Sequence, residues 1–340
     1  MRRSYLDVTR LVACFLVIVN HTNSRLFLSC GPSGLWFSSL AYFFLSKIAV
    51  PLFLLVSGEL LLGRCDGYRK TAGRFFRILG ALALFSLLYY IRDCLLSGER
   101  FDLAAFFLTI GKTQITNAFW YLYLYLALML MLPPMQRMAS GFEKRDYLYF
   151  MGLSLVVLGS VPYLKHFFPA LDGLKGLYLP LFSVYLGLLV AGRYFGSVCS
   201  VSGRTALAAG AILVLCLALN VLGTWREYLT DSAQYLFFDD RTGILITVPA
   251  VCAFLLLRYL FTRASLSERA SKTLGYLSGL TFGAYLLSDM AIGFTEGAFE
   301  SLSLRIGPFP AVILWELAVF AACMLVTALL KQIPFLKKLI

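Results

Sequence analysis

Long apolar runs recur through the whole chain of 340 residues and restrict its fold more than any other feature. The hydrocarbon core of a bilayer is about 30 Å thick, so a helix needs roughly 20 mostly apolar residues to cross it. About ten stretches meet this requirement, and they cover residues 11–28, 38–62, 76–96, 119–138, 148–164, 178–196, 206–223, 243–261, 274–294 and 309–330. Short loops join them. We therefore predict an all-α membrane protein, with one transmembrane domain over residues 1–340 that forms a bundle of about ten helices.

Composition and charge agree with a membrane protein. The chain is 60% hydrophobic and 14% charged, whereas soluble domains are about 45–50% apolar and roughly 25% charged. The runs do not alternate between polar and apolar residues, which excludes an outer-membrane barrel. Roughly two thirds of the 30 Lys and Arg residues lie on the side that carries both termini, and the positive-inside rule places that side in the cytoplasm. The net charge of +12 is thus mainly an orientation signal, and no nucleic-acid partner is expected.

The first apolar run carries two groups that could do chemistry, Arg10 and His21. At about 100° and 1.5 Å per residue, their spacing places them within about 20° of one helical stripe and roughly 16 Å apart along it. Charged groups inside a span are costly and are functional candidates by default. Asp7, one turn before Arg10, is placed to pair with it. The alternative is structural, with Arg10 as a snorkelling anchor and His21 as an interfacial residue bonded to a backbone carbonyl.

The second run, residues 38–62, adds Lys47, Ser57 and Glu59. Lys47 lies about 14 Å from the outer end of this run, at a depth comparable to that of His21. A cation beside an imidazole favours its neutral form, which can act as a base. Glu59 lies near the inner face and either pairs with a cytoplasmic arginine or is an interfacial acid, and we favour the pairing.

Three other polar features carry less specific signals. The outer connection 224–242 is acidic and aromatic, which suits a sugar-bearing substrate or, as for most charged loops, contact with solvent. The second of the two histidines, His166, is expected to be exposed in an outer loop. The eight cysteines form no CxxC pair and the histidines lie far apart, so no metal site is expected.

The segment YLDVTRLVACFLVIVNHT resembles the opening of the acyltransferase family 3 membrane proteins, whose first helix carries an arginine, ten residues and then a histidine. Arg10 and His21 have this spacing, and Asp7 matches the acidic residue ahead of the arginine. The resemblance continues, in order, in KIAVPLFLLVSGELLLG, GRFFRIL, FWYLYLYLALMLMLP and SVYLGLLVAGRYFG. It is greatest to the enterobacterial common antigen O-acetyltransferase group and to the membrane half of VanT-type serine racemases. One segment departs, since many relatives have Tyr-Leu-x-His where FGAYLLSDM has Ser288 and Asp289.

This resemblance implies a multi-pass protein of the bacterial cytoplasmic (inner) membrane. Its activity would be that of an O-acyltransferase, with acetyl as the usual group. The acyl group would pass from cytoplasmic acetyl-CoA, or another acyl-CoA, to a hydroxyl of an envelope polysaccharide or lipid-linked glycan. Acetyl-CoA is then a substrate, membrane lipid surrounds the protein, and no metal takes part. The pantetheine arm is long enough to carry the thioester from the inner surface into the bundle.

The resemblance also implies roles for individual residues. His21 would be the general base on the acceptor hydroxyl, or would carry the acyl group transiently. Lys47, or a neighbouring amide or hydroxyl, would stabilise the oxyanion. Arg10 and Asp7 complete the catalytic set, with Arg10 at the inner mouth of the donor's path. Inner-face cations suit the phosphates of coenzyme A, although the same cations serve as topology determinants. The donor would meet Arg10, Arg69, Lys70, Arg74, Arg77, Ser57 and Glu59, and the acceptor Asn20, Asn23, Trp120 and Tyr121.

Two other classes of protein also fit a bundle of membrane helices. A proton-coupled transporter of a sugar or lipid would use His21, Lys47 and Asp289 as a proton relay, and a non-catalytic scaffold would use none of them. No pair of inverted, interrupted helices stands out in the sequence, which disfavours the transporter. Transfer of a labelled acyl group by the purified protein would separate the three classes.

Overall fold

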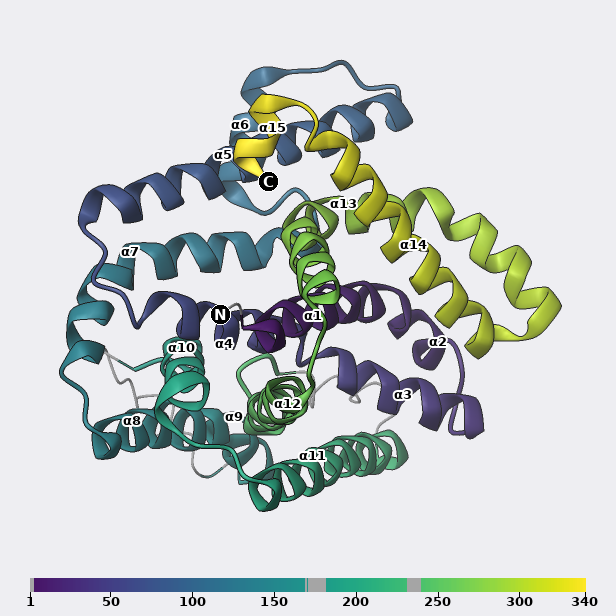
Figure 1. Cartoon of the computed structure of the whole chain (residues 1–340). Coiled ribbons are helices and arrows are strands. Elements are labelled where there is room, and N and C mark those ends of the chain that lie inside the picture. The colour runs from purple at the N-terminus through teal and green to yellow at the C-terminus, as the bar shows by residue number, and fades with distance from the viewer. Residues whose placement is uncertain (1–2, 169, 171–181, 231–239) are drawn as a thin grey trace.

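The computed structural model describes residues 3–168, 170, 182–230 and 240–340, and the elements within these ranges are helical (Figure 1). Nine segments of this described part are long and apolar enough to cross a membrane, which confirms the all-α membrane bundle. They are Ser4–Leu28, Gly34–Leu61, Tyr68–Ser97, Asn117–Ser140, Lys144–Phe167, Gly203–Thr230, Ile244–Arg263, Glu268–Ile306 and Pro308–Leu330. The predicted span 178–196 differs. Residues 178–181 lie outside the described part, and the remainder falls in the shorter apolar helix Val184–Val198.

Several spans consist of more than one element. In chain order the described elements are α1 (Ser4–Thr22), α2 (Ser24–Leu28), α3 (Gly34–Ser46), α4 (Ala49–Leu61), α5 (Tyr68–Ser97), α6 (Leu103–Lys112), η1 (Asn117–Phe119), α7 (Trp120–Ser140), α8 (Lys144–Met151), η2 (Gly152–Val157), α9 (Leu158–Phe167), α10 (Val184–Arg193), η4 (Tyr194–Val198), α11 (Gly203–Thr230), α12 (Ile244–Arg263), α13 (Glu268–Ile306), α14 (Pro308–Leu330) and α15 (Pro334–Leu339). The first span is interrupted at Asn23, between α1 and α2. The second is interrupted at residues 47–48, between α3 and α4.

The interruption between α3 and α4 has a local cause in Pro51, the third residue of α4. Proline has no N–H group, so a continuous helix would lose one backbone hydrogen bond there. The first turn of any helix has unpaired N–H groups, and a helix that begins at Ala49 therefore accommodates Pro51 without that loss. Irregular backbone at membrane depth is tolerated where it is buried in protein or lines a cavity. Here Lys47 and Pro51 both line a cavity.

α1 lies in the middle of the bundle. It packs against α3, α4, α12, α13 and α14, and these helices surround it in Figure 1. Its side chains fit this position, because Ala13, Cys14 and Ile18 are apolar, small or branched, and all three are fully buried. A helix that is apolar on most of its surface is expected to be buried in the protein. The polar residues of α1 therefore lie in the protein interior.

α4 and α10 cross at unusually close range. A Cβ atom on Gly58 would overlap the main chain of Leu189, and a Cβ on Gly192 would overlap the main chain of Leu55. Small residues on both sides of a crossing allow two membrane helices to touch at their backbones. This contact fixes the part of α4 that carries Ser57 and Glu59.

α13 is much longer than the apolar run from which it was predicted. The run covers residues 274–294, whereas the helix covers Glu268–Ile306. At about 1.5 Å per residue it measures roughly 60 Å, about twice the hydrocarbon thickness. Gly307, with a φ of 87°, ends it and reverses the chain into α14. The two helices pack as an antiparallel hairpin along one side of the bundle (Figure 1).

Candidate functional site

Four cavities follow one another along α1 and form the candidate site. The Glu59 cavity, of about 450 Å³, lies at the N-terminal end of α1, and the Ser57 cavity, of about 380 Å³, adjoins it. The Lys47 cavity, of about 300 Å³, comes next, followed by the Asp289 cavity of about 480 Å³. Neighbouring cavities share wall residues, which are Arg10 for the first two, Tyr121 and Tyr285 for the middle two, and Asn20, His21 and Asn117 for the last two.

The row of cavities runs from Arg10 to His21. α1 is helical over Ser4–Thr22, so these two residues are separated by roughly 16 Å along its axis. Arg10 lines the first two cavities and His21 the last two. The structure thus places both residues on the walls of these cavities, at opposite ends of one row. We call the two ends of the bundle the Arg10 end and the His21 end.

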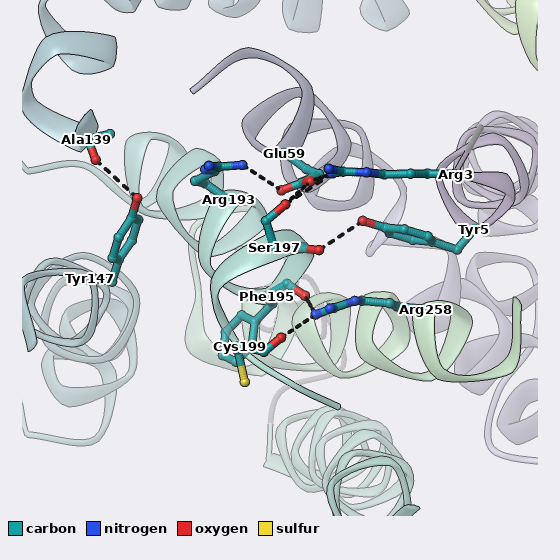
Figure 2. Close-up of polar contacts among 11 residues, drawn as sticks. Arg3, Tyr5, Glu59, Ala139, Tyr147, Arg193, Phe195, Ser197, Cys199 and Arg258 are labelled. Carbon is teal, nitrogen blue, oxygen red and sulfur yellow. Dashed lines mark hydrogen bonds and ion pairs between the residues drawn. The ribbon is translucent and has the colours of Figure 1, made fainter. Parts of the chain in front are cut away.

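Two buried acids, Asp7 and Glu59, line the first cavity. Figure 2 shows the contacts of Glu59. Its carboxylate pairs with Arg3 and with Arg193, whose Nη1 lies 3.8 Å from Oε2, and it accepts a hydrogen bond from Ser197. Of the two alternatives for Glu59, the structure therefore supports pairing with arginine. These contacts join the start of α1, the end of α4 and η4. Tyr5 strengthens the same junction, since its hydroxyl donates to the carbonyl of Gly196 at 3.3 Å.

Asp7 and Arg10 both line the Glu59 cavity. Asp7 is buried in the first turns of α1. The pairing of Asp7 with Arg10 stays a prediction. The roles predicted for the two residues are supported by their shared place in the cavity wall.

The Ser57 cavity is suited to an anion with a long, less polar part. Arg10, Arg74 and Arg77 line it, and none of the described wall residues carries a carboxylate. Ser57 also lines it, with Oγ 3.1 Å from the hydroxyl of Tyr125. Most other wall residues are apolar or aromatic. Arginine binds phosphate oxygens through charge-assisted hydrogen bonds, so three arginines beside an apolar wall fit a phosphate-bearing ligand with an aliphatic arm.

The cations predicted to bind the donor divide into two groups. Arg74 and Arg77 line the Ser57 cavity, whereas Arg69 and Lys70 are exposed and line none of the four cavities. Arg74 Nη2 lies 2.7 Å from Asp66 Oδ2. This neighbouring guanidinium holds the pKa of the Asp66 carboxyl below its usual value. The ion pair thus fixes the start of α5, which carries Arg74 to the cavity.

Tyr121 and Tyr285 stand between the Ser57 cavity and the Lys47 cavity, and both line each of them. Their rings meet edge to face, with centroids 6.0 Å apart and planes at 88°. The hydroxyl of Tyr285 donates to the carbonyl of Ala118. The ring of Tyr121 stacks on Phe53 with centroids 6.0 Å apart. The pair therefore forms a well-supported constriction between the Arg10 end and the His21 end.

The Lys47 cavity brings together five predicted site residues from three separate runs: Asn20, His21, Lys47, Trp120 and Tyr121. Lys47 Nζ lies 4.0 Å from the ring centroid of Phe43. The guanidinium of Arg241 lies 4.3 Å from the ring centroid of Trp120. Cations over aromatic faces are held by the ring quadrupole. His21 thus shares its cavity with two cations.

The Asp289 cavity completes the row at the His21 end. It is lined by Asn20, His21, Arg92, Gln114, Ile115, Thr116, Asn117 and Asp289. Thr116 donates a hydrogen bond to Oδ2 of Asp289. The intramembrane acid that departs from the family pattern therefore faces the same cavity as the imidazole on α1.

The end of α1 is anchored on two sides, which fixes the position of His21. Thr22 Oγ1 donates to Glu316 Oε1 of α14 at 2.6 Å. The amide of Asn23, predicted to meet the acceptor, is fully buried; it donates to the carbonyl of Ser39 at 2.6 Å and accepts from the Ser39 hydroxyl at 3.0 Å. Asn23 lines none of the four cavities. Its hydrogen bonds hold the end of α1 against α3.

The expectation for His166 is wrong. It lies near the end of α9, where its Nε2 is 3.1 Å from Glu227 Oε1 of α11, and its side chain is only 24% exposed. The connection predicted over 224–242 is partly helical, because α11 continues to Thr230. The acidic and aromatic stretch over residues 231–239 lies outside the described part.

Sequence reasoning missed several residues of the cavity walls. Tyr285 carried a signal, since a tyrosine inside an apolar span usually needs a hydrogen-bond partner. Thr116 and Asn117 form a polar pair shortly before the predicted run 119–138, which is a weaker signal. Nothing in the sequence pattern indicates that Arg193 and Arg241 reach the first and third cavities, because each lies far along the chain from the other wall residues.

Comparison with known proteins agrees with this arrangement. The family model of acyltransferase family 3, described as an acyltransferase domain, matches residues 3–331, nearly the whole chain. No curated protein and no solved structure matches the chain. The match confirms the resemblance found in the Arg10–His21 segment and the runs that follow it. This chain belongs to acyltransferase family 3 and is a membrane acyltransferase.

Proposed function

We propose that this acyltransferase is an O-acetyltransferase of the bacterial cytoplasmic membrane. It takes an acyl group from acyl-CoA, with acetyl-CoA as the donor, and transfers it to a hydroxyl of an envelope polysaccharide or lipid-linked glycan. The Arg10 end faces the cytoplasm. The observation that carries the proposal is the row of cavities. Its second cavity is lined by three arginines and by no carboxylate among the described residues, and its third is lined by the imidazole of His21.

The donor fits the Ser57 cavity by charge and by shape. The phosphates of coenzyme A bind near Arg74 and Arg77, in the N-terminal part of α5. The less polar pantetheine arm lies along the aromatic wall of the cavity. Arg10 lines both this cavity and the Glu59 cavity and guides the donor inward. Glu59 acts indirectly, since its ion pairs hold Arg3 and Arg193 at the wall of the first cavity.

The thioester reaches His21 by passing Tyr121 and Tyr285. The Nε2 or Nδ1 atom of neutral His21 accepts the proton of the acceptor hydroxyl while the hydroxyl oxygen attacks the thioester carbon. The C–O bond forms, the C–S bond breaks, and the imidazolium returns the proton to the departing thiolate. Lys47 and the amides of Asn20 and Asn117 surround this position and stabilise the oxyanion of the tetrahedral intermediate.

The test uses purified protein with acetyl-CoA labelled in the acetyl group and measures both release of the coenzyme A thiol and label on added glycans. We expect His21→Gln to lower the rate of transfer by about 10²–10⁴-fold, the usual contribution of a general base. His166→Gln is the matched control, because His166 lies outside the cavities and should keep the wild-type rate. Full activity in the His21 variant, or no reaction of the wild type with acyl-CoA, contradicts the proposal.

A further inference from the structure

The Asp289 cavity has an unusual composition for a chain that is 60% hydrophobic. Seven of the eight wall residues that the structure describes have polar side chains, and Ile115 is the exception. Among them are two asparagines, a glutamine, a threonine, an arginine and an aspartate in addition to His21. Amides, carboxylates and guanidinium groups are the planar side chains that donate to and accept from hydroxyl groups. The volume of about 480 Å³ lies within the range of roughly 300–1,000 Å³ that is typical of small-molecule sites.

Asp289 and His21 reach this cavity from different helices. His21 comes from the end of α1, and Asp289 comes from α13. Thr116, in the segment before η1, donates to Oδ2 of Asp289 and holds the carboxylate in place. Among the hydrogen bonds and ion pairs of the described residues, this is the one contact of Asp289. The other oxygen, Oδ1, is therefore available to a ligand.

The charge of the cavity favours an uncharged ligand. Arg92 is the one Lys or Arg among its described wall residues, and its guanidinium is bound to Asp93 at 2.6 and 2.8 Å. Asp289 remains as a second negative group that would repel an anion. A carboxylate accepts strong hydrogen bonds from hydroxyl groups, so a polyhydroxylated ring suits this wall better than a phosphate.

From these observations we propose that the Asp289 cavity is the acceptor subsite, that it binds an uncharged sugar ring, and that Asp289 fixes which hydroxyl reacts. Oδ1 of Asp289 accepts a hydrogen bond from one hydroxyl, and this contact presents the neighbouring hydroxyl to His21 across the cavity. The proposal rests on the proposed function, since it assigns a subsite of the same reaction.

The experiment uses octyl β-D-glucoside as the acceptor probe, with full-length protein purified in a detergent that contains no sugar. Release of the coenzyme A thiol and formation of acetylated glucoside are both followed, at varied glucoside and varied acetyl-CoA concentrations. Asp289→Asn removes the charge and keeps the shape. The amide oxygen of asparagine accepts a weaker hydrogen bond than a carboxylate does, so we expect kcat/KM for the glucoside to fall by about 10–100-fold. The KM for acetyl-CoA should stay unchanged.

Two further variants and one control separate positioning from structure. Asp289→Glu should recover part of the lost kcat/KM, and Thr116→Val should lower it by a smaller factor because it only loosens the carboxylate. Glu300→Gln is the control, since Glu300 lies on the same stripe of α13, three turns further on, and is exposed. Recovery of correctly folded protein is checked for each variant by size-exclusion chromatography.

The outcomes are distinct. A wild-type value of kcat/KM for the glucoside in Asp289→Asn overturns the proposal. So does a wild-type protein that releases coenzyme A thiol but acetylates no glucoside, or that acetylates glucose 1-phosphate in its place. A wild-type protein that releases no thiol from acetyl-CoA fails one step earlier, and that result contradicts the proposed function itself.

Discussion

Single residues set the chemistry of this protein through their spacing on α1. Arg10 and His21 lie on nearly one stripe because eleven residues span about three helical turns. Both line cavities of the same row. Polar groups within a membrane span are costly, which is why they are found together at functional sites. The residues between the two ends matter as much, because Tyr121 and Tyr285 divide the row of cavities.

The tyrosine pair is expected to limit the length of the acyl group. Beyond the pair the cavity measures about 300 Å³ and is lined by Lys47, Asn20 and His21 among others, so a long alkyl chain would displace water from polar groups without replacing their hydrogen bonds. Tyr121→Ala should widen the passage and raise the rate with butyryl-CoA relative to acetyl-CoA by about tenfold, equivalent to about 1.4 kcal/mol. The ratio of kcat/KM for the two donors measures this.

Tyr285→Phe serves as the comparison, because it keeps the ring and removes only the hydrogen bond to Ala118. We expect it to leave the donor preference close to that of the wild type. An unchanged preference in Tyr121→Ala would mean that the constriction does not select the acyl chain.

At the scale of elements, interruptions and close crossings position the site. Ser46, Lys47 and Pro51 line the Lys47 cavity from the turn between α3 and α4 and from the start of α4. An unbroken helix would point these side chains in different directions. The crossing of α4 and α10 depends on Gly58 and Gly192, each of which lies against the main chain of the other helix. Most residues of the short helix α10 are buried here, because α4 meets it at backbone distance.

Gly192→Ala is expected to destabilise the protein. The added methyl group would overlap the main chain at Leu55, which cannot move aside as a flexible side chain would. Overpacking typically costs about 1–3 kcal/mol, and we expect a value near the upper end. The midpoint of thermal unfolding of the detergent-solubilised protein, followed by size-exclusion chromatography, measures the loss.

Gly293→Ala is the matched control, because Gly293 also lies inside a helix but nothing surrounds its Cβ position. This variant should unfold at or above the wild-type midpoint, since alanine is favoured over glycine in helices by about 1 kcal/mol. If the Gly192 and Gly293 variants unfolded at the same temperature, the backbone contact of α4 and α10 would not be limiting.

At the scale of the whole molecule, orientation in the membrane decides which end meets the donor. The loop between α4 and α5 lies at the Arg10 end, where Asp66 pairs with Arg74, and the loop after α5 lies at the opposite end of that helix. The side of the membrane that carries the α4–α5 loop has the excess of Lys and Arg, which predicts that this loop faces the cytoplasm. This assignment is a prediction of the sequence, and the donor path depends on it.

Thiol labelling of intact cells checks this orientation. In a chain that keeps only Cys65, which is exposed in the α4–α5 loop, a membrane-impermeant maleimide should react only after the cells are opened. A second variant lacks all native cysteines and carries Glu99→Cys in the loop after α5. The reagent should react with this variant in intact cells. The reversed pattern would place the Arg10 end outside and rule out a cytoplasmic donor for the Ser57 cavity.

The sequence by itself determined the membrane class, the approximate spans and the likeness to the family. These properties depend on local composition, because a bilayer imposes the same length and polarity on every span. The sequence also indicated Arg10, His21 and Asp289 as candidates, since each is a polar group inside an apolar run. Helix ends were less well predicted, as α13 shows, because an apolar run marks the lipid-facing part of a helix and not its caps.

Only the tertiary structure decided which residues meet. It brought Tyr121 and Tyr285 into one constriction, set Asp289 across a cavity from His21, and turned Asn23 into a contact with α3. The physical reason is that helix crossing angles and interhelical contacts depend on packing between residues distant in the chain, such as Gly58 with Leu189 and Gly192 with Leu55. Spacing within one helix can therefore predict a stripe of side chains, whereas the far wall of each cavity comes from helices that the stripe does not specify.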